Sequence, residues 1–187
     1  MGLQTWREVL VNGSVDGPTL TAAAAASCIP TPSRIILPNN FFYIGRMLKI
    51  TAAGRISCAV TTPGTARFDV RTGPSGTIVA YDTGALNLNI VAKTTIPWLL
   101  EITLTCRAVG AGTATNFMGV GMFQSEAVVG APLPTVGGNG ALLCPVGTPA
   151  VGTGFDNTAA NALDLFFTQT VGTGSMTLHQ YVVEALN

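Results

Sequence analysis

The chain has 187 residues, of which 48% are hydrophobic and only 10% are charged, whereas an average soluble domain is about 25% charged. Nine lysines and arginines balance nine aspartates and glutamates, and the basic residues form no cluster, which argues against a nucleic-acid-binding protein. The high hydrophobic share excludes a disordered chain, and a chain so poor in charge is poorly equipped to stay a soluble monomer. We therefore expect burial in an assembly.

Export and membrane insertion are not expected either. No segment has the roughly 20 continuous apolar residues that a membrane-spanning helix needs. Residues 1–8 lack both the apolar stretch and the basic lead of a secretory signal.

The four cysteines are spread singly, at Cys28, Cys58, Cys106 and Cys144. Because there is no C-x-x-C pair and the sequence has one histidine, a structural zinc site is not expected. An even count permits two disulfides, but the apolar surroundings of three cysteines and the lack of an export signal favour reduced, buried thiols.

The N-terminal region predicts one strand followed by an irregular segment. Residues 4–11 have a strand composition and stop at Asn12-Gly13, a turn pair. Residues 19–38 are rich in alanine and then in proline, so we expect an extended crossing segment or arm rather than a ladder strand. Residues 1–38 as a whole are predicted to form a partly irregular N-terminal arm.

The middle of the chain shows the strongest period-two patterns. Residues 65–71 alternate without a break, with Phe68 on one face and Asp69 on the other. Residues 98–107 alternate again, with threonines Thr103 and Thr105 on the polar face. Residues 47–57 follow the same pattern less cleanly. This periodicity is typical of half-buried strands in an antiparallel sheet.

Weaker strands fill the rest of the chain. Residues 77–81 and 86–91 flank Asp82-Thr83-Gly84, which reads as a hairpin or a bulge, and residues 117–126 alternate small and large side chains. Residues 157–167 fit a capped helix or a strand, and the β-branched residues that follow favour the strand. Residues 162–171 and 176–186, joined by Gly172-Thr173-Gly174, are predicted to form a hairpin.

These short strands with Gly/Pro turns predict an all-β protein, a sandwich or a barrel. No fixed repeat and no linker-like change of composition is visible, so we expect a single domain over residues 1–187.

The sequence offers little support for catalysis or for a metal. His179 is a lone histidine in a strand pattern, and no nucleophile motif accompanies it. The Gly-rich segments 110–112 and 152–154 lack the spacing of a nucleotide-binding loop. Asp82 and Asp156 are read as turn formers rather than Ca²⁺ ligands. We therefore predict no enzyme, no cofactor and no metal site.

The charges divide unevenly along the chain. Every lysine and arginine lies at or before Arg107, and only four acidic residues follow: Glu126, Asp156, Asp164 and Glu184. A sandwich can mix the two parts in space. The alternative is a polar molecule with a basic face that binds an acidic partner or the next subunit.

Several phrases resemble a group of small tailed-phage virion proteins, and together they run over nearly the whole chain. They are residues 2–6 (GLQTW), 26–30 (ASCIP), 37–42 (LPNNFF), 49–57 (KITAAGRIS), 61–65 (TTPGT) and 151–156 (VGTGFD). The resemblance implies a jelly-roll sandwich that forms a homotrimer on the outside of the virion. It implies a capsid decoration (cement) protein that binds the major capsid protein, or else a tail or fibre part. It carries over no catalytic residues.

Three functions follow as expectations. As a decoration protein, made in the host cytoplasm without a signal peptide, the chain would stabilise the phage head, with Arg7, Arg34 and Arg46 as capsid contacts. As a tail or fibre module that binds a receptor or glycan, it would use the aromatic residues Phe41, Phe42, Tyr43 and Tyr81. A glycan hydrolase would need two converging carboxylates, and the sequence nominates no such pair.

Overall fold

The computed structural model describes residues 6–59, 62–128 and 140–186. These residues form strands and one 3₁₀ turn, and they include no helix long and apolar enough to cross a membrane. In chain order the elements are β1 (Arg7–Asn12), β2 (Ala26–Ser27), η1 (Thr31–Ser33), β3 (Ile35–Leu37), β4 (Met47–Cys58), β5 (Thr65–Thr72), β6 (Ile78–Asp82), β7 (Leu86–Asn87), β8 (Lys93–Ala108), β9 (Asn116–Gln124), β10 (Ala141–Cys144), β11 (Asn161–Gln169) and β12 (Ser175–Leu186).

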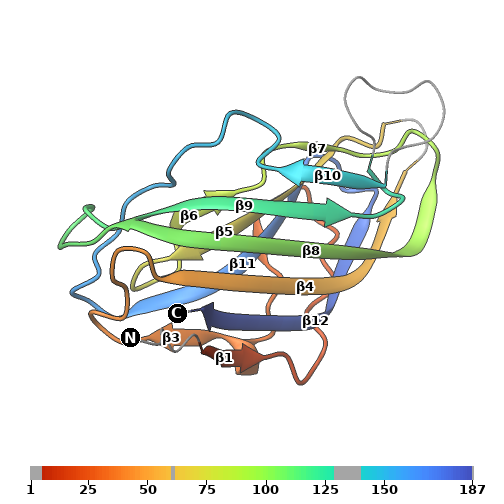
Figure 1. The fold of residues 1–187 in the computed structure, drawn as a ribbon. Coiled ribbons are helices and arrows are strands. Elements are labelled where there is room, and N and C mark those ends of the chain that lie inside the picture. The colour runs from red at the N-terminus through yellow and green to blue at the C-terminus, as the bar shows by residue number, and fades with distance from the viewer. Residues whose placement is uncertain (1–5, 60–61, 129–139, 187) are drawn as a thin grey trace.

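Two antiparallel sheets pack face to face (Figure 1). Sheet A has the strand order β1-β12-β4-β8-β9-β10. Sheet B has the order β2-β11-β5-β6, with β3 also paired to β11 and β7 to β5. The predicted all-β antiparallel sandwich is therefore confirmed.

The early and late strands of the chain wrap around each other as in a jelly roll. β4 and β5 are consecutive in the chain, but β4 lies in sheet A and β5 in sheet B. Likewise β11 lies in sheet B and β12, which follows it, in sheet A. β4 pairs with β12 in sheet A, while β5 pairs with β11 in sheet B. Such nested pairing across both sheets is the outer wrap of a jelly roll. Inside this wrap, β8, β9 and β10 follow one another across sheet A as a meander.

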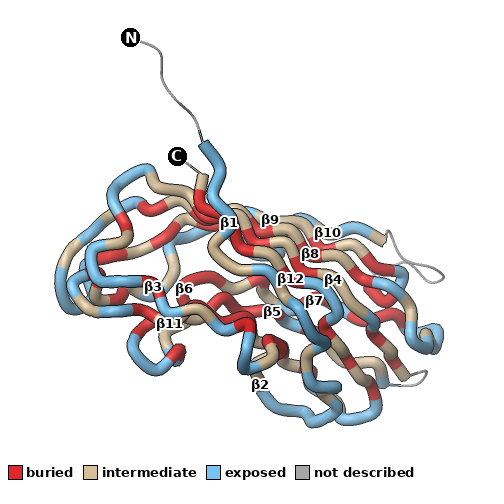
Figure 2. Tube along the Cα trace, turned by 90° about the horizontal axis from the view of Figure 1, so that it is seen from below, coloured by how far each residue is buried: buried red, intermediate tan, exposed pale blue. Residues whose placement is uncertain are grey.

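The core lies between the sheets, where Figure 2 shows the buried residues of both layers. The alternation predicted for residues 98–107 is confirmed in β8, whose apolar positions are buried while its threonines are only partly covered. Phe68 of β5 contacts Trp98, Phe123 and Phe167 with ring centroids 5.1–5.4 Å apart. Burying one such side chain contributes about 1.5–3 kcal/mol, so these contacts hold the two sheets together.

An irregular segment closes each long edge of the sandwich. Along one edge, Gly13 N donates to Tyr181 O at 2.6 Å in sheet A. Cys28 N, further along this segment, donates to Leu165 O at 2.9 Å in sheet B. Residues 13–28 thus cross from sheet A to sheet B and overlap only the first half of the crossing segment expected over residues 19–38.

The other edge is closed by residues 151–155. Gly152 N donates to Phe117 O of β9 at 3.0 Å, and Thr153 N donates to Val79 O of β6 at 3.1 Å. A Cβ at Gly152 would overlap the carbonyl oxygen of Ala80, so the close approach requires glycine there. Gly152 of the Gly-rich segment 152–154 is therefore needed where the two sheets approach each other.

Two strand predictions were wrong in detail. Gly172-Thr173-Gly174 does not form a hairpin, because β11 lies in sheet B and β12 in sheet A, so the turn crosses between sheets. Residues 19–38 do contain ladder strands, the short β2 and β3, because the prolines lie outside them and remove no ladder hydrogen bond.

Two open alternatives are decided by the structure. Residues 161–169 are the strand β11 rather than a helix. β6 and β7 both pair with β5, so Asp82-Thr83-Gly84 interrupts one edge strand instead of turning a hairpin.

Candidate functional site: the outer face of sheet A

Sheet A exposes its outer face to solvent, and cross-strand register orders the side chains of this face into rows. Positions that alternate with the buried ones point outward, because successive side chains of a strand lie on opposite faces. The rows are Arg7, Leu186, Met47, Thr105 and Met118; Val9, Glu184, Lys49, Thr103 and Val120; Asn12, Val182, Thr51, Glu101, Met122 and Leu143; and Gln180, Ala53, Leu99, Gln124 and Ala141.

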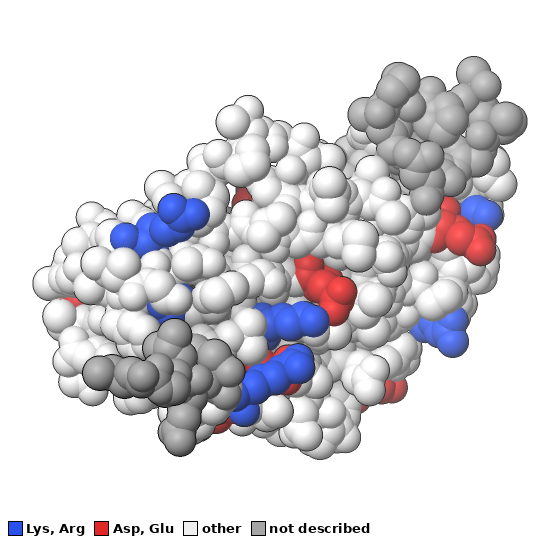
Figure 3. All heavy atoms as spheres, in the orientation of Figure 1, with Lys and Arg blue, Asp and Glu red and all other residues white. Residues whose placement is uncertain are grey.

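Four charged residues occur in these rows, and we call them the charge line: Arg7, Glu184, Lys49 and Glu101 on β1, β12, β4 and β8 in turn. Arg7 forms an ion pair with Glu184. Lys49 Nζ lies 2.9 Å from Glu101 Oε1, and Lys49 is also the cross-strand partner of Glu184. Figure 3 shows positive and negative side chains adjacent near the middle of a face that is otherwise mostly uncharged. The four residues of the charge line therefore carry no net charge together.

One side of this face carries an apolar stripe. We call Met118, Val120 and Met122 of β9, with Leu143 of β10, the β9–β10 stripe. Val120 is 60% exposed and Leu143 is 75% exposed. The inward positions of β9 are apolar or glycine as well, so this strand is apolar on both faces. Contiguous exposed apolar side chains mark an interaction surface, and methionine adapts its shape to a partner.

A hollow of ≈ 320 Å³ lies between β12, β4 and β8 on the same face. Short side chains, Ala53 and Thr51, line it together with Leu99, and the Arg7–Glu184 pair adjoins them. The other lining residues are Gln180 and Val182, so the hollow has both polar and apolar walls, and its two charged residues are paired with each other.

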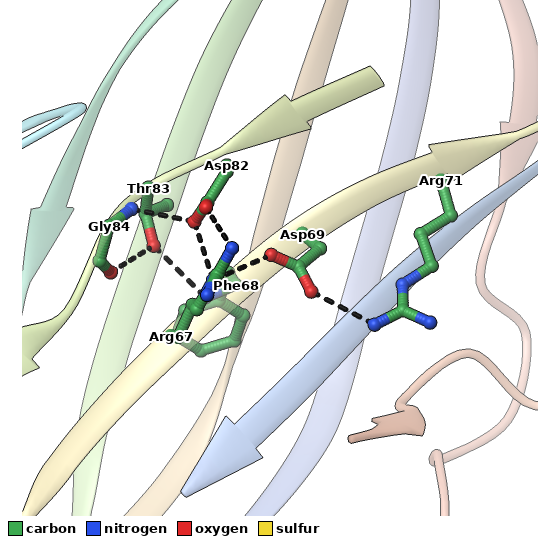
Figure 4. Close-up of polar contacts among 7 residues, drawn as sticks. All are labelled: Arg67, Phe68, Asp69, Arg71, Asp82, Thr83 and Gly84. Atoms are coloured by element: carbon green, nitrogen blue, oxygen red, sulfur yellow. Dashed lines mark hydrogen bonds and ion pairs between the residues drawn. The ribbon is translucent and has the colours of Figure 1, made fainter. Parts of the chain in front are cut away.

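The outer face of sheet B has a different character, because its charges form a closed network (Figure 4). Asp69 accepts from Arg67 Nε and from Arg71 Nη2, each at 3.0 Å, although Asp69 itself is only 3% exposed. Arg67 also donates to Asp82, the cross-strand neighbour of Asp69. Two carboxylates directly opposite would repel, and Arg67 between them offsets this repulsion. The sequence placed Asp69 on the polar face and gave no sign of this burial.

Asp164 extends the charged region of sheet B. Ser27 Oγ donates to Asp164 Oδ1 at 2.6 Å, and Arg34 Nε lies 3.6 Å from Asp164 Oδ2. Burial raises the pKa of Asp164, although the Ser27 hydrogen bond and the charge of Arg34 act in the opposite direction. Arg71 stacks on the ring of Phe166 at 3.9 Å. Both oxygens of Asp164 thus have partners within the chain, whereas the buried Nε of Arg71 has no hydrogen-bond partner among the described residues.

The uneven division of charge along the sequence does not become two charged faces. Arg7 pairs with Glu184, Arg34 with Asp164, and Lys93 with Glu126 at 3.2 Å. In each pair a base from the first part of the chain meets an acid from the second, because the sandwich brings early and late strands together. These pairs favour the first alternative, in which the sandwich mixes the two parts of the chain in space.

The three arginines predicted as capsid contacts do not form one patch. Arg7 lies on β1 at the edge of sheet A and contacts Glu184. Arg34 lies just before β3, on sheet B, and faces Asp164. Arg46 directly precedes β4, where its guanidinium stacks on the Phe41 ring at 3.8 Å and donates to Phe41 O at 2.8 Å.

The four predicted aromatic contacts separate into buried and exposed residues. Phe42 and Tyr81 are each 4% exposed and belong to the core, so neither can present a ring to a glycan. Phe41 is half-buried beneath Arg46. Tyr43 is 49% exposed in the loop before β4. Sequence alone could not separate these residues, because a loop aromatic and a core aromatic have the same local pattern.

The acidic turns and the lone histidine have local structural roles. Asp82 Oδ1 accepts from Gly84 N at 2.7 Å, and Asp156 Oδ1 accepts from Thr158 N at 2.8 Å, which is typical of Asx turns. His179 Nδ1 lies 2.9 Å from Asp16 Oδ1 at the surface. Within the described ranges, no group of three or more His, Cys, Asp or Glu side chains is placed to hold a metal ion.

All four cysteines are buried free thiols, as the sequence favoured. Burial raises the pKa of Cys144 to about 11, and it raises the pKa of Cys28 far above the ordinary thiol value. The thiolate is the reactive form of cysteine, so burial disfavours reaction at these residues in the folded protein.

Comparison with known proteins adds little to this description. No protein-family model and no curated protein matches the sequence. Among solved structures, a protein of unknown function, SO2946 from Shewanella oneidensis MR-1, is similar with 9% identity and a TM-score of 0.40, over 96% of this chain and 78% of that one. The CBM2 module of the evolved Dit of Lactobacillus casei BL23 phage J-1 is similar with 10% identity and a TM-score of 0.30, over 82% of this chain and 68% of that one. At these scores neither structure bears on what this protein does.

Proposed function

We propose that the protein is a structural component of a tailed-phage particle, a capsid decoration protein that binds the outer surface of the head. The observation that carries the proposal is the β9–β10 stripe, where Val120 and Leu143 expose apolar side chains with no charged residue among the stripe's members. The phage-like phrases of the sequence supply the kind of particle. The proposed partner is the major capsid protein.

The stripe suits this role better than the three predicted arginines. Arg7 and Arg34 already contact carboxylates of the same chain, and Arg46 is stacked on Phe41. A surface arginine that keeps its intramolecular partner gains little from a second one. Apolar side chains on a sheet face gain about 25 cal/mol for each Å² removed from water. Binding that favours the assembled shell stabilises it by mass action.

The protein is proposed to act without catalysis. Asp69 and Asp82 are neighbouring carboxylates, and Arg67 joins them at 3.0 and 2.7 Å. Because Arg67 contacts both carboxylates, the pair does not flank a space for a glycosidic bond, as the two acids of a glycan hydrolase must.

Capsid binding tests the proposal. Purified wild-type protein, Val120→Lys and Leu143→Lys are mixed with capsids stripped of decoration, and the bound protein is measured by co-sedimentation. We expect the wild type to bind and to raise the temperature at which capsids break, and both lysine variants to bind at least about tenfold more weakly, since each buries an unpaired charge. The matched control is Ile36→Lys, which changes an exposed apolar side chain of β3 on the other sheet. Equal binding by all variants, or unchanged capsid stability, would refute the proposal.

A tail or fibre module that binds a glycan is the alternative. The loop before β4 favours it, because Tyr43 and Ile44 are 49% and 67% exposed side by side. Aromatic rings at such positions stack on sugars through their apolar faces. Binding on a glycan array that Tyr43→Ala abolishes would support the alternative, and an empty array would remove it.

A further inference from the structure

A part of the chain with almost no charge covers one long edge of the sandwich. From residue 108 to residue 155 the sequence has a single charged residue, Glu126. This part contains β9, β10 and the segment 145–152, whose end joins β9 to β6. Val146 and Val151 of this segment are 44% and 48% exposed. Exposed apolar side chains are therefore not confined to the β9–β10 stripe.

The segment 145–152 continues the stripe over the edge of the sandwich. Val151 forms an isolated β-bridge with Met118, a member of the stripe. Val146, near the other end of the segment, lies over Gly84 in the link after β6, because a Cβ at Gly84 would lie 2.8 Å from Val146 Cγ2. The apolar surface thus runs from the outer face of sheet A toward sheet B.

A hollow of ≈ 290 Å³ lies between this segment and β6, and we call it the edge hollow. Pro145, Ala150 and Val151 form an apolar part of its lining, which also includes Tyr81 and Asp82 of β6. A closed cavity of about 150 Å³ holds a benzene molecule, so the edge hollow has room for one large side chain.

Backbone hydrogen bonds fix both ends of the segment that forms the edge hollow. Val146 N donates to Thr83 O at 2.9 Å, and Gly152 N donates to Phe117 O at 3.0 Å. A pocket that is already formed costs little conformational entropy when a partner fills it. In protein interfaces such pockets receive the anchor side chains that dominate affinity.

Asp82 is the charged residue of the lining, and its charge is already compensated (Figure 4). Its Oδ1 accepts from Arg67 Nε and from Gly84 N, each at 2.7 Å, and its Oδ2 also contacts Arg67. A basic side chain would lose its hydration for a carboxylate that already has a partner, and an acidic one would be repelled. The edge hollow therefore fits an uncharged, apolar group.

We propose that the edge hollow is the anchor pocket of the capsid contact, and that it receives one large apolar side chain of the major capsid protein. The β9–β10 stripe covers the partner surface beside this anchor. The inference rests on the proposed function and adds to it a site and the chemistry of its occupant, an uncharged segment with a side chain of the size of leucine or phenylalanine.

A variant that fills the edge hollow tests the inference. Gly147 is exposed and belongs to the lining, and a Cβ there would meet no atom within 4 Å, so Gly147→Leu should fold and occupy the space. We expect it to bind stripped capsids at least about tenfold more weakly in co-sedimentation, because the anchor side chain is shut out. The matched control is Gly172→Leu, an exposed glycine of the turn between β11 and β12, where a Cβ would lie 3.4 Å from Thr21 O. It should bind like the wild type.

Charges of both signs test the chemistry of the occupant. Ala150 lines the edge hollow and is exposed, so Ala150→Asp and Ala150→Lys are both compatible with the fold. Each should weaken capsid binding at least about tenfold, because an apolar occupant leaves either charge buried without a partner. If one of the two variants binds like the wild type or better, the occupant carries the opposite charge and the inference is overturned.

Thiol protection locates the contact independently of affinity. The four native cysteines are buried, so an exposed cysteine introduced by Thr148→Cys, in the lining of the edge hollow, is the thiol that reacts with iodoacetamide. We expect capsid binding to slow this reaction at least about tenfold. Thr173→Cys, an exposed position in the turn between β11 and β12, should react at the same rate with and without capsids.

The outcomes separate the anchor pocket from the proposed function. If the wild type binds capsids and Val120→Lys does not, but Gly147→Leu binds like the wild type or the Thr148→Cys thiol stays reactive, the anchor pocket is refuted while the proposed function stands. If the wild type does not bind capsids, both are refuted. Urea unfolding checks that each variant is folded, and the folded variants decide the question.

Discussion

The two outer faces of the sandwich treat their charged side chains in opposite ways. On sheet B, Asp69 is almost fully buried. It forms ion pairs with Arg67 and Arg71, which lie on the same strand, β5. On sheet A, the charge line is partly exposed, and the β9–β10 stripe beside it is apolar and uncovered. Sheet B thus pairs its carboxylates with arginines of the same chain, whereas sheet A leaves the apolar side chains Val120 and Leu143 exposed. Under the proposed function, the ion pairs of sheet B contribute to stability, and the β9–β10 stripe of sheet A serves association with a partner.

Asp69→Ala gives the largest expected effect on this comparison. It removes the acceptor shared by Arg67 and Arg71, so the largely covered Arg71 loses its ion pair while the exposed Arg67 keeps its contact with Asp82. We expect the free energy of unfolding to fall by about 2–4 kcal/mol. This loss is smaller than for a fully buried ion pair, because Arg67 can turn toward water. Urea unfolding measures this change. Its counterpart on sheet A, Glu101→Ala, should cost less than about 1 kcal/mol, because exposed ion pairs contribute little. Equal losses on both sheets would contradict the distinction.

Gly119→Ala and Val120→Ala compare the two sides of one strand. A Cβ at Gly119 would overlap the ring of Tyr81 in the core, so we expect a loss of about 1–3 kcal/mol from overpacking. Val120 points outward and is mostly exposed, so its truncation should change the free energy of unfolding by less than about 0.5 kcal/mol. Thermal unfolding of both variants at equal concentration checks the order. A larger loss for Val120→Ala would mean that the outer face is covered within the chain.

Val120→Lys sharpens the separation of stability from association. Its unfolding free energy at low protein concentration should stay within about 0.5 kcal/mol of the wild type, because the new charge remains in water. Its capsid binding should nevertheless be lost. Parallel losses in both measurements would place the stripe among the stabilising contacts instead.

Asp164 gives the smallest effect, through the pH dependence of stability. Because burial raises its pKa in the folded protein, the folded state takes up a proton before the unfolded state does as the pH falls. Between the raised pKa and the ordinary aspartate value, the wild type should therefore gain stability relative to Asp164→Asn as the pH is lowered. Urea unfolding of both proteins over a pH series measures the difference. A relative loss over that range would mean that the contacts with Ser27 and Arg34 outweigh desolvation.

The sequence predicted the fold class well, because alternation depends on residues that are neighbours in the chain. The patterns around Phe68 and along residues 98–107 located β5 and β8 and their inward faces. Turn composition was less informative, since Gly172-Thr173-Gly174 marks a reversal of direction but does not say which sheet the next strand joins. The nested pairing of β4 with β12 is a long-range property that no local pattern contains.

The candidate site was harder to predict than the fold. Alternation places Asp69 on the outward side of β5 but cannot say that Arg67 and Arg71 fold over it. The charge line joins Arg7 to Glu184, and only the strand order brings these two residues together. The stripe on β9 was visible as alternation of small and large side chains, yet its exposure depends on which side of the sheet faces the core.

The place of β12 between β1 and β4 also governs how the molecule is made. On a growing chain, β12 is synthesised after every other strand of the sandwich, so β1 and β4 must wait for it without their shared neighbour. Contacts between residues so far apart in sequence form slowly, and an unpaired strand edge is prone to aggregate in the meantime. We therefore expect β1 and β12 to become protected from hydrogen exchange together and late during refolding, after the local pairing of β8, β9 and β10.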